Sequence, residues 1–338
     1  MKNQNFGSEN LYELLGLHPK APEFVVHAAY RAMMKQNHPD LGGSDSIPAR
    51  LNQAKEILLD PEKRRKYDEY LRQAAEKQIG NYQVLEQIGQ GAFGITLKAK
   101  HTKIGGLACL KQNIYISSGD IAIITKEAEL LWDIHHHSLP TLRDFFQLDD
   151  GSCVMAMSYV SGASLDAIVE KRRKEGETLE PEHACWMTQR LLNALNYLHF
   201  HGIIHGDVKP NNIIIVPNEH NAVLVDFGLA TLRPIKGIKP QGYTEVFAPP
   251  EILELKTPLP QSDLFSLGKT MIYALGGNPA YNSYPGSVPK NIQDFFNRLV
   301  EKNPLKRPVW KDVDLVMEIS KIRMDTFGRK SSNLELKI

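Results

Sequence analysis

A glycine-rich segment between two β-prone runs is the feature that most constrains how this chain folds. The segment IGQGAFG, residues 88–94, follows the run YQVLEQ and precedes the run ITLKAK. β-Branched and aromatic residues of this kind favour strands, and the glycines favour a turn between them. A dinucleotide-binding loop leads from a strand into a helix, so a strand on each side argues against that fold. The segment therefore predicts a β-hairpin at the start of a small β-rich lobe.

Beyond this hairpin, the chain changes from a β-rich part to a helical part. A further β-prone run, GLACLKQNI, follows at residues 106–114, and helical patterns dominate after about residue 160. Short apolar runs at 213–216 and 222–225 predict strands within the helical part. We therefore expect an α+β architecture with a β-rich small lobe over about 82–157 and an α-rich large lobe over about 161–322. The polar, unpatterned stretch 323–338 predicts a flexible tail.

Residues 9–75 show a different pattern, that of an all-α helical hairpin. Apolar residues recur at helical spacing in two segments, at Val25, Ala29 and Met33 and again at Leu51 and Leu58. Between them lies NHPDLGGSDS, where a proline and two glycines break any helix. A charged helical stretch follows, and we expect residues 76–81 to be a linker to the next domain.

Charge and cysteine content exclude several classes of protein. The chain has 40 lysines and arginines against 39 aspartates and glutamates, whereas binding to nucleic acid or to an anionic membrane needs a basic surplus. Cys109, Cys153 and Cys185 stand far apart, so neither a disulfide framework nor a structural zinc site is expected. No apolar run approaches the roughly 18–20 residues that cross a bilayer. We expect a soluble, cytoplasmic protein without nucleic-acid or membrane partners.

Three short motifs place the groups needed for phosphoryl transfer in order along the chain. They are HGDVKPNN at 205–212, DFG at 226–228 and APPE at 248–251. In the first motif, Asp207 accepts or orients the proton of an attacking hydroxyl, and Lys209 offsets charge on the moving phosphoryl group. Asn212 and Asp226 supply hard oxygen ligands for magnesium. The set predicts a site that transfers a phosphoryl group.

Together with the glycine-rich hairpin, these motifs make residues 82–322 resemble a eukaryotic-type protein kinase domain. The resemblance implies a two-lobed fold, ATP and Mg²⁺ as cofactors, and catalytic roles for Asp207, Lys209, Lys111 and Glu127. Lys111 in ACLK is a cation suited to nucleotide phosphates, and Glu127 in KEAELL is the expected partner of that lysine. Glu129 competes for this pairing. We favour Glu127 because its distance from the HHSLP segment suits the corresponding helix of the family.

The same resemblance implies which residues contact the nucleotide. Met157 occupies the gatekeeper position, and Ser158 to Val160 form the hinge whose backbone holds adenine. Cys109 stands where a small alanine usually packs against adenine, and Thr96 replaces a valine that usually covers it. The implied nucleotide-binding residues are Ile88, Gly89, Gly91, Phe93, Gly94, Thr96, Cys109, Lys111, Met157, Ser158 and Val160.

Four further residues are implied to support the site. Asp263 matches the helix aspartate that braces the catalytic loop, and Arg307 matches the arginine that pairs with Glu251. Thr244 and Lys209 are the residues that the serine/threonine branch of the family uses. Serine or threonine hydroxyls of a protein are therefore the expected acceptors.

The N-terminal hairpin resembles the J domain of DnaJ-type co-chaperones. The segments LYELLGL at 11–17, AAYRAMMKQNHPD at 28–40 and LNQAKEILLDPEKRRKYDEYL at 51–71 follow that family's pattern in order and spacing. The resemblance implies that a DnaK-type chaperone contacts the loop at His38, Pro39 and Asp40 and the preceding helix at Arg31 and Lys35.

The leading interpretation is a Mg-ATP-dependent serine/threonine protein kinase whose J domain recruits a DnaK-type chaperone. Because Gly206 replaces the usual arginine, we expect the activity to depend less on phosphorylation of the segment 226–251.

The HGD motif also resembles that of small-molecule phosphotransferases related to aminoglycoside and choline kinases, but those enzymes have histidine in place of Lys209 and lack the segment 244–251. A non-enzymatic alternative is a J-domain adaptor with a catalytically silent kinase fold. The presence of Lys111, Asp207 and Asp226 argues against it.

Overall fold

The computed structural model describes residues 11–36, 46–76, 78–91 and 94–328. The chain divides into two compact units, Met1–Val84 and Leu85–Ile338. Helices come first, then a sheet, then a mainly helical lobe, which confirms the expected α+β fold. Within the described ranges, no helix combines the length and the apolar character that a membrane span needs.

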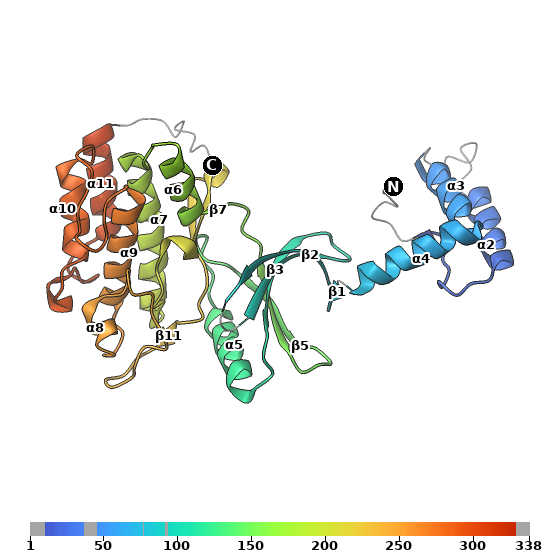
Figure 1. The fold of residues 1–338 in the computed structure, drawn as a ribbon, viewed down its shortest axis with the longest axis horizontal. Helices are drawn as coiled ribbons and strands as arrows, with labels where there is room; N and C mark the ends of the chain where they lie inside the picture. The colour runs from blue at the N-terminus through green and yellow to red at the C-terminus, as the bar shows by residue number, and fades with distance from the viewer. Residues whose placement is uncertain (1–10, 37–45, 77, 92–93, 329–338) are drawn as a thin grey trace. The chain divides into compact units, whose positions relative to one another are not determined.

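The described helices of the N-terminal unit are α1 (Leu11–Leu14), α2 (Glu23–Gln36), α3 (Ser46–Leu58) and α4 (Pro61–Glu76). Helices α2 and α3 pack side by side as the predicted hairpin (Figure 1). Their apolar faces meet in a small core, in which Val26 and Leu51 are fully buried. The Arg64 guanidinium on α4 donates hydrogen bonds to the carbonyls of Pro19 and Ala21, which fixes the turn before α2.

The expected linker at 76–81 contains a short strand. Helix α4 ends at Glu76, and β1 (Gln78–Ile79) pairs antiparallel with the start of β2 (Tyr82–Gln90). Gly80 makes the turn between them with a φ of 54°, a conformation that glycine adopts without strain. The expected linker therefore includes a strand at residues 78–79, which the sequence did not predict because a strand of two residues carries no periodicity.

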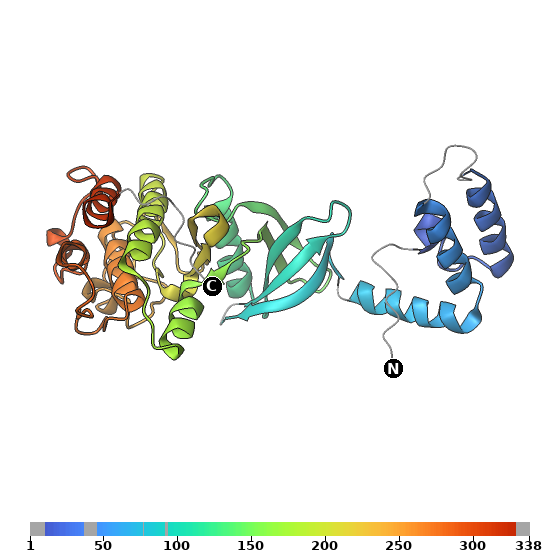
Figure 2. The same cartoon turned by 90° about the horizontal axis from the view of Figure 1, so that it is seen from above.

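A six-stranded sheet in the order β1-β2-β3-β4-β6-β5 forms the small lobe (Figure 2). Its other elements are β3 (Gly94–His101), β4 (Leu107–Asn113), helix α5 (Ser118–Leu131), β5 (Leu142–Gln147) and β6 (Cys153–Ser158). The predicted hairpin lies between β2 and β3. A Cβ atom on Gly94 would lie 2.4 Å from the Gln112 carbonyl oxygen, so only glycine allows β3 and β4 to approach this closely.

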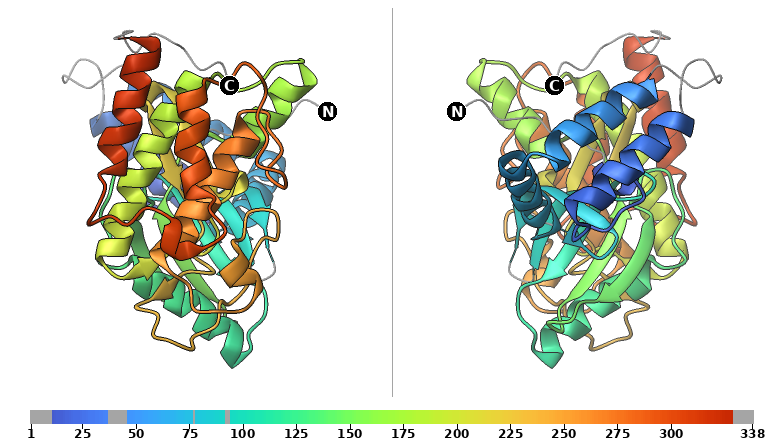
Figure 3. Two further views of the ribbon diagram at one scale, coloured as in Figure 1. Left: turned by 90° about the vertical axis from the view of Figure 1, so that its left-hand side faces the viewer. Right: turned by 90° about the vertical axis from the view of Figure 1, so that its right-hand side faces the viewer.

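The large lobe is mainly helical, and its elements follow one another as β7 (Ala163–Ser164), α6 (Leu165–Lys174), α7 (Pro181–Phe200), β8 (Ile203–Ile204), η2 (Pro210–Asn212), β9 (Ile213–Val216), η3 (Pro217–Glu219), β10 (Asn221–Leu224), β11 (Thr231–Leu232), α8 (Pro250–Leu253), α9 (Pro260–Ala274), α10 (Lys290–Leu299), η4 (Pro304–Lys306) and α11 (Leu315–Phe327). The two strands predicted from short apolar runs are β9 and β10, which pair antiparallel. Helix α11 runs beside α7 (Figure 3, left, red and yellow-green).

Helix α11 extends into the stretch expected to be a flexible tail. It ends at Phe327, so the prediction is wrong for residues 323–327. Ile322 and Phe327 pack against the core of the large lobe, and Ile322 follows Leu315 and Ile319 at helical spacing. Polar residues between these positions obscure the spacing in the sequence. Residues 329–338 lie outside the described residues.

Candidate active site

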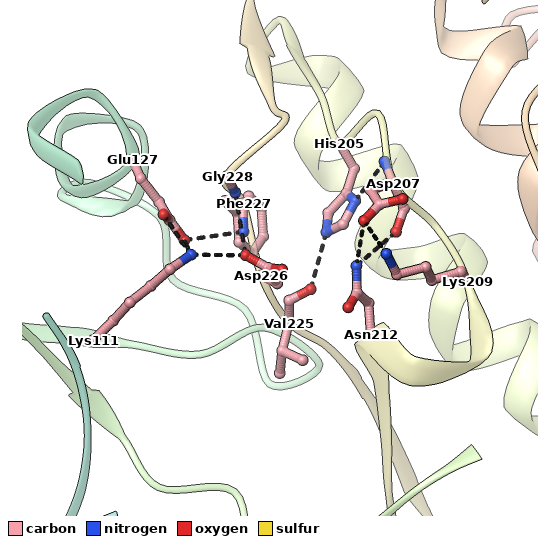
Figure 4. Close-up of polar contacts among 10 residues, drawn as sticks. All are labelled: Lys111, Glu127, His205, Asp207, Lys209, Asn212, Val225, Asp226, Phe227 and Gly228. Atoms are coloured by element: carbon pink, nitrogen blue, oxygen red, sulfur yellow. Dashed lines mark hydrogen bonds and ion pairs between the residues drawn. The ribbon is translucent and has the colours of Figure 1, made fainter. Parts of the chain in front are cut away.

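Lys111 on β4, Glu127 on α5 and Asp226 after β10 form one charged group (Figure 4). The Lys111 Nζ lies 2.7 Å from Glu127 Oε2 and 2.7 Å from Asp226 Oδ1. Glu127 is buried and Glu129 is exposed, so Glu127 is the glutamate that makes the pair. Its Oε1 also accepts a hydrogen bond from the Phe227 backbone N–H at 3.1 Å. Helix α5 and the DFG segment are thereby tied to the same lysine.

The charges in this group stabilise one another. Burial alone would lower the pKa of Lys111, but the carboxylates of Glu127 and Asp226 outweigh burial and raise that pKa. Burial alone would raise the pKa of Asp226, but the Lys111 ammonium has the larger effect and lowers that pKa. Lys111 is therefore protonated and Asp226 ionised at neutral pH. The Asp226 side chain remains 48% exposed, and an ionised, accessible carboxylate of this kind suits a hard cation.

The Asp207 carboxylate is held by three neighbouring side chains. Lys209 Nζ lies 2.7 Å from its Oδ2, and the Asn212 amide nitrogen donates to the same oxygen at 2.9 Å. The Thr244 hydroxyl donates to Oδ1 at 2.8 Å and accepts a hydrogen bond from Lys209 Nζ at 3.0 Å. The sequence implied only a supporting role for Thr244, whereas the structure places its hydroxyl directly on Asp207. Since Asn212 uses its nitrogen on Asp207, its amide oxygen is the atom left for a cation.

Asp263 on α9 binds the backbone of the loop that carries Asp207. Its Oδ2 accepts from the His205 N–H at 2.8 Å, and its Oδ1 accepts from the Gly206 N–H at 2.9 Å. Gly206 has a φ of 78°, and a Cβ atom there would lie 2.8 Å from the Leu229 carbonyl oxygen. The glycine at this position therefore allows a close approach between the loop and the residues after DFG.

His205 connects this loop to the DFG segment. Its Nδ1 accepts from the Asp207 N–H at 3.3 Å, and its Nε2 lies 3.3 Å from the Val225 carbonyl oxygen, so Nε2 carries the proton. The imidazole packs edge-on against the Phe227 ring, with the centroids 4.8 Å apart. Burial lowers the pKa of His205, which agrees with a neutral ring in this position.

Two residues that the sequence analysis did not predict, His199 and Trp310, hold Asp263, which in turn binds the loop that carries Asp207. Trp310 Nε1–H donates to His199 Nδ1 at 2.9 Å, and His199 Nε2 lies 2.8 Å from Asp263 Oδ2. Because an indole N–H only donates, His199 Nδ1 must accept, and a neutral His199 therefore donates from Nε2 to Asp263. His199 stands close to the HGD motif, which is a signal that the sequence offers. Trp310 lies 111 residues away from His199 and has no local signal.

A buried ion pair holds the segment that ends in APPE. Arg307 Nη1 lies 2.6 Å from Glu251 Oε1, and Arg307 Nη2 lies 2.9 Å from Glu251 Oε2. The Arg307 side chain is fully buried, and the guanidinium also donates to the carbonyl oxygens of Gln261, Glu301 and Lys302. This arrangement satisfies a charge that would be costly to bury alone.

The predicted nucleotide-contact residues lie on neighbouring strands of the small-lobe sheet. They are Ile88 and Gly89 on β2, Thr96 on β3, Cys109 and Lys111 on β4, Met157 and Ser158 on β6, and Val160 after β6. The Gly91 N–H donates to the Gly94 carbonyl at 2.9 Å, and Phe93 lies outside the described residues. Burial raises the pKa of the Cys109 thiol to about 11, so Cys109 remains a protonated, small apolar group.

The predicted chaperone-contact residues are described only in part. Arg31 and Lys35 are exposed on α2, and their spacing of four residues places them on one face of that helix. His38, Pro39 and Asp40 lie outside the described residues.

Comparison with known proteins identifies both parts of the chain. Residues 82–322 match the protein kinase domain, and residues 10–68 match the DnaJ domain. The chain is 28% identical over 258 residues to the "Probable serine/threonine-protein kinase" of Dictyostelium discoideum. The aligned part covers 70% of this chain and 50% of that protein. It is 27% identical over 263 residues to serine/threonine-protein kinase D of Synechocystis sp., and that aligned part covers 68% of this chain and 50% of the relative. The chain spans about half the length of these two curated relatives. It belongs to the protein kinase family and carries a DnaJ domain on the N-terminal side of the kinase domain.

Proposed function

We propose that this chain is a Mg-ATP-dependent protein kinase that phosphorylates serine or threonine. The observation that carries the proposal is the Asp207 carboxylate, held by Lys209, Asn212 and Thr244. Phosphoryl transfer to a hydroxyl needs a carboxylate that orients the hydroxyl and a cation that offsets charge on the phosphoryl group. Asp207 and Lys209, with their charged atoms 2.7 Å apart, provide both.

The residues that would hold magnesium and the nucleotide phosphates fit that role. Asp226 offers an ionised, half-exposed carboxylate, and Asn212 offers the amide oxygen opposite the nitrogen that binds Asp207. When bound, Mg²⁺ neutralises negative charge on the phosphates. Lys111, kept protonated by Glu127 and Asp226, supplies a further cation for the same phosphates.

A protein acceptor is favoured over a small molecule. The segment 244–251 begins with a threonine that contacts Asp207 and ends with Glu251, which Arg307 holds in a buried ion pair. Such a segment offers a firmly held surface beside the catalytic carboxylate on which an extended peptide can lie. The adaptor alternative is disfavoured because Lys111 and Asp207 keep the partners that catalysis requires.

Phosphate transfer from labelled ATP tests this proposal. The purified chain with Mg²⁺ would be offered its own hydroxyls, a generic serine/threonine substrate protein and a DnaK-type chaperone. We expect label on serine or threonine that is lost in Asp207→Asn and retained in the matched control Asp149→Asn, which changes an exposed carboxylate in the β5–β6 turn. ATP binding without transfer to any protein would contradict the proposal and favour the adaptor or the small-molecule phosphotransferase.

We further propose that the DnaJ domain recruits a DnaK-type chaperone to this kinase. The support is the HPD tripeptide between two helices that pack as a hairpin, together with the exposed cations Arg31 and Lys35 on the first of them. Opposite charges on the chaperone would attract this face and set its orientation.

Stimulated ATP hydrolysis by a DnaK-type chaperone tests this second role. The full chain should increase the chaperone's turnover, and His38→Gln should abolish the increase. Arg31→Ala together with Lys35→Ala should weaken it in a salt-dependent manner. Equal stimulation by the parent and by His38→Gln would contradict chaperone recruitment through this loop.

We also propose a cytoplasmic location. Cys109, Cys153 and Cys185 are free thiols, and free thiols persist in a reducing compartment. Fractionation of cells with an antibody against the chain tests this location, and recovery with the membrane or secreted fraction would contradict it.

A further inference from the structure

The loop that carries Asp207 is supported by a residue close to the end of the kinase domain. Trp310 follows η4 and donates its indole N–H to His199 on α7, and His199 contacts Asp263 on α9. Asp263 then accepts hydrogen bonds from two backbone N–H groups of the Asp207 loop. The chemistry of phosphoryl transfer proposed above uses none of these three side chains, so their arrangement calls for a separate explanation.

Each contact in this series fixes the next one. Because the indole N–H can only donate, it keeps the lone pair of His199 on Nδ1 and the ring proton on Nε2, facing Asp263. The side chains of His199 and Asp263 are 2% and 1% exposed, so solvent does not readily replace a lost partner. Burial alone would raise the pKa of Asp263, but its hydrogen bonds lower that pKa, with the bond from His199 the largest of these contributions.

A second part of the site is held three residues away from Trp310. Arg307 forms the buried ion pair with Glu251, at the end of the segment whose Thr244 hydroxyl donates to Asp207 Oδ1. Asp207 is therefore supported in two ways, through the backbone of its own loop and through Thr244. Both supports lead back to the same short stretch of chain, which keeps the two parts of the site in register with each other.

Helix α7 contains another hydrogen bond between an indole and an imidazole, and that bond leads elsewhere. The Trp186 Nε1–H donates to His183 Nδ1 at 3.0 Å, and both residues are 2% exposed. His183 Nε2 lies 3.5 Å from Glu180 Oε2 at the start of the helix, and Trp186 stacks on the His220 ring with the centroids 4.1 Å apart. This pair has the same donor and acceptor as the first one, but its contacts join the start of α7 to the turn before β10.

We propose that Trp310 is a positioning residue for phosphoryl transfer, because its indole N–H fixes the tautomer of His199 and thereby the geometry of the Asp207 loop. The inference rests on the proposed kinase activity and adds a residue to the support of that site. Without the indole N–H, the ring proton of His199 is free to move to Nδ1, which leaves an unprotonated Nε2 facing the Asp263 carboxylate. Two acceptors in this position repel each other, and Asp263 loses its hold on the loop.

Two matched variants of the full-length chain test the proposal. Trp310→Phe removes the N–H that leads to the catalytic loop, and Trp186→Phe removes the N–H of the other pair. Labelled ATP and a generic serine/threonine substrate protein give the kinetic constants. We expect Trp310→Phe to lower kcat about ten- to a hundredfold, since a small misplacement of a reacting group has effects of this order. The KM for ATP should stay close to that of the parent. Trp186→Phe should keep the parent kcat, although it also loses a buried hydrogen bond.

Two further measurements separate the hydrogen bond from packing. The nitrogen NMR shifts of the His199 ring, assigned with His199→Gln, show which nitrogen carries the proton. We expect Nε2–H in the parent and a population of Nδ1–H in Trp310→Phe. Benzothienylalanine at position 310, the sulfur analogue of tryptophan, keeps the bicyclic shape and lacks the N–H. It should reproduce the loss of kcat seen in Trp310→Phe, and it keeps the test available if the phenylalanine variant does not fold.

The outcomes distinguish this inference from the kinase proposal. Parent kcat in Trp310→Phe, an equal loss in Trp186→Phe, or an unchanged His199 tautomer overturns the inference and leaves the kinase proposal standing. Parent kcat with benzothienylalanine assigns Trp310 to packing and overturns the inference as well. Absence of transfer by the parent, with activity no better than that of Asp207→Asn, overturns both.

Discussion

The kinase domain and the N-terminal helical unit are built on different principles. Among the described residues, every buried charged side chain lies in the kinase domain, including Glu127, Asp263 and Arg307. The core of the N-terminal unit is made of residues such as Leu51 and Tyr67, and its charged side chains lie toward the surface. A buried charge needs a specific partner, and in the kinase domain residues of the same chain provide those partners. The function proposed for the helical unit depends on a second protein, and none of its described charged side chains is buried.

The largest expected effect is on catalysis. Asp226→Asn removes the carboxylate proposed for magnesium and one of the two partners of Lys111. We expect kcat to fall by roughly 1000-fold, as when one charge-stabilising group is removed from an active site. Initial rates with labelled ATP measure the loss, and the thermal unfolding temperature should stay close to that of the parent. Activity within tenfold of the parent would mean that the charged group is structural.

The next effect is on stability of the kinase domain. Arg307→Leu leaves the Glu251 carboxylate buried without its partner and should lower the free energy of unfolding by about 3–5 kcal/mol. The control Arg298→Leu removes an exposed pair with Glu318 and should cost about 1 kcal/mol or less. Denaturant titration followed by fluorescence compares the two. Equal costs would contradict the distinction between buried and exposed charges.

A core truncation tests the other unit. Leu51 is fully buried, so Leu51→Ala should destabilise the N-terminal unit by about 2–5 kcal/mol. Phe24 is 75% exposed, and Phe24→Ala should leave that stability nearly unchanged. Hydrogen exchange resolved by segment measures the effect within residues 11–76. We expect kinase activity to be unaffected by either change, and a matching loss of activity in Leu51→Ala would show that the two units are coupled.

A smaller effect is expected at Gly206. In Gly206→Ala, the added Cβ atom would lie 2.8 Å from the Leu229 carbonyl oxygen, at a residue whose φ is positive. We expect this substitution to lower the free energy of unfolding by about 1–3 kcal/mol and to reduce kcat. Gly237 also has a positive φ, 97°, but a Cβ atom there meets nothing within 4 Å. Gly237→Ala is therefore the matched control for strain alone. If the two variants lose equal stability and activity, the close approach of the catalytic loop is unimportant.

The smallest effect concerns pH. Burial, with a contribution from His137, lowers the pKa of His136 from its ordinary value of 6.5 to about 4, and its Nδ1 accepts from the Ser138 N–H. As pH falls through 6.5 the unfolded chain binds a proton at His136, whereas the native state does not until about pH 4. The free energy of unfolding should therefore decrease over this range, and His136→Phe should make the decrease shallower. The exposed neighbour variant His135→Gln should follow the parent.

The extent of successful prediction differs between elements. The hairpin around Gly94 and the strands β9 and β10 were predictable, because turn residues and short apolar runs are local signals. Strand β1 and the last turns of α11 were not, because the first is two residues long and the second depends on Ile322 and Phe327 reaching the core. The contact between His199 and Trp310 was also beyond sequence patterns.

By itself, the sequence determined the residue types of the chemistry and their order, since HGDVKPNN, DFG and APPE are contiguous motifs. It also determined the two-part organisation, because the periodicity changes near residue 80. Only the tertiary structure decided that Lys111 pairs with Glu127 rather than Glu129 and that the Thr244 hydroxyl lies on Asp207. These facts depend on how distant segments pack, and contacts across the chain leave no trace in local spacing.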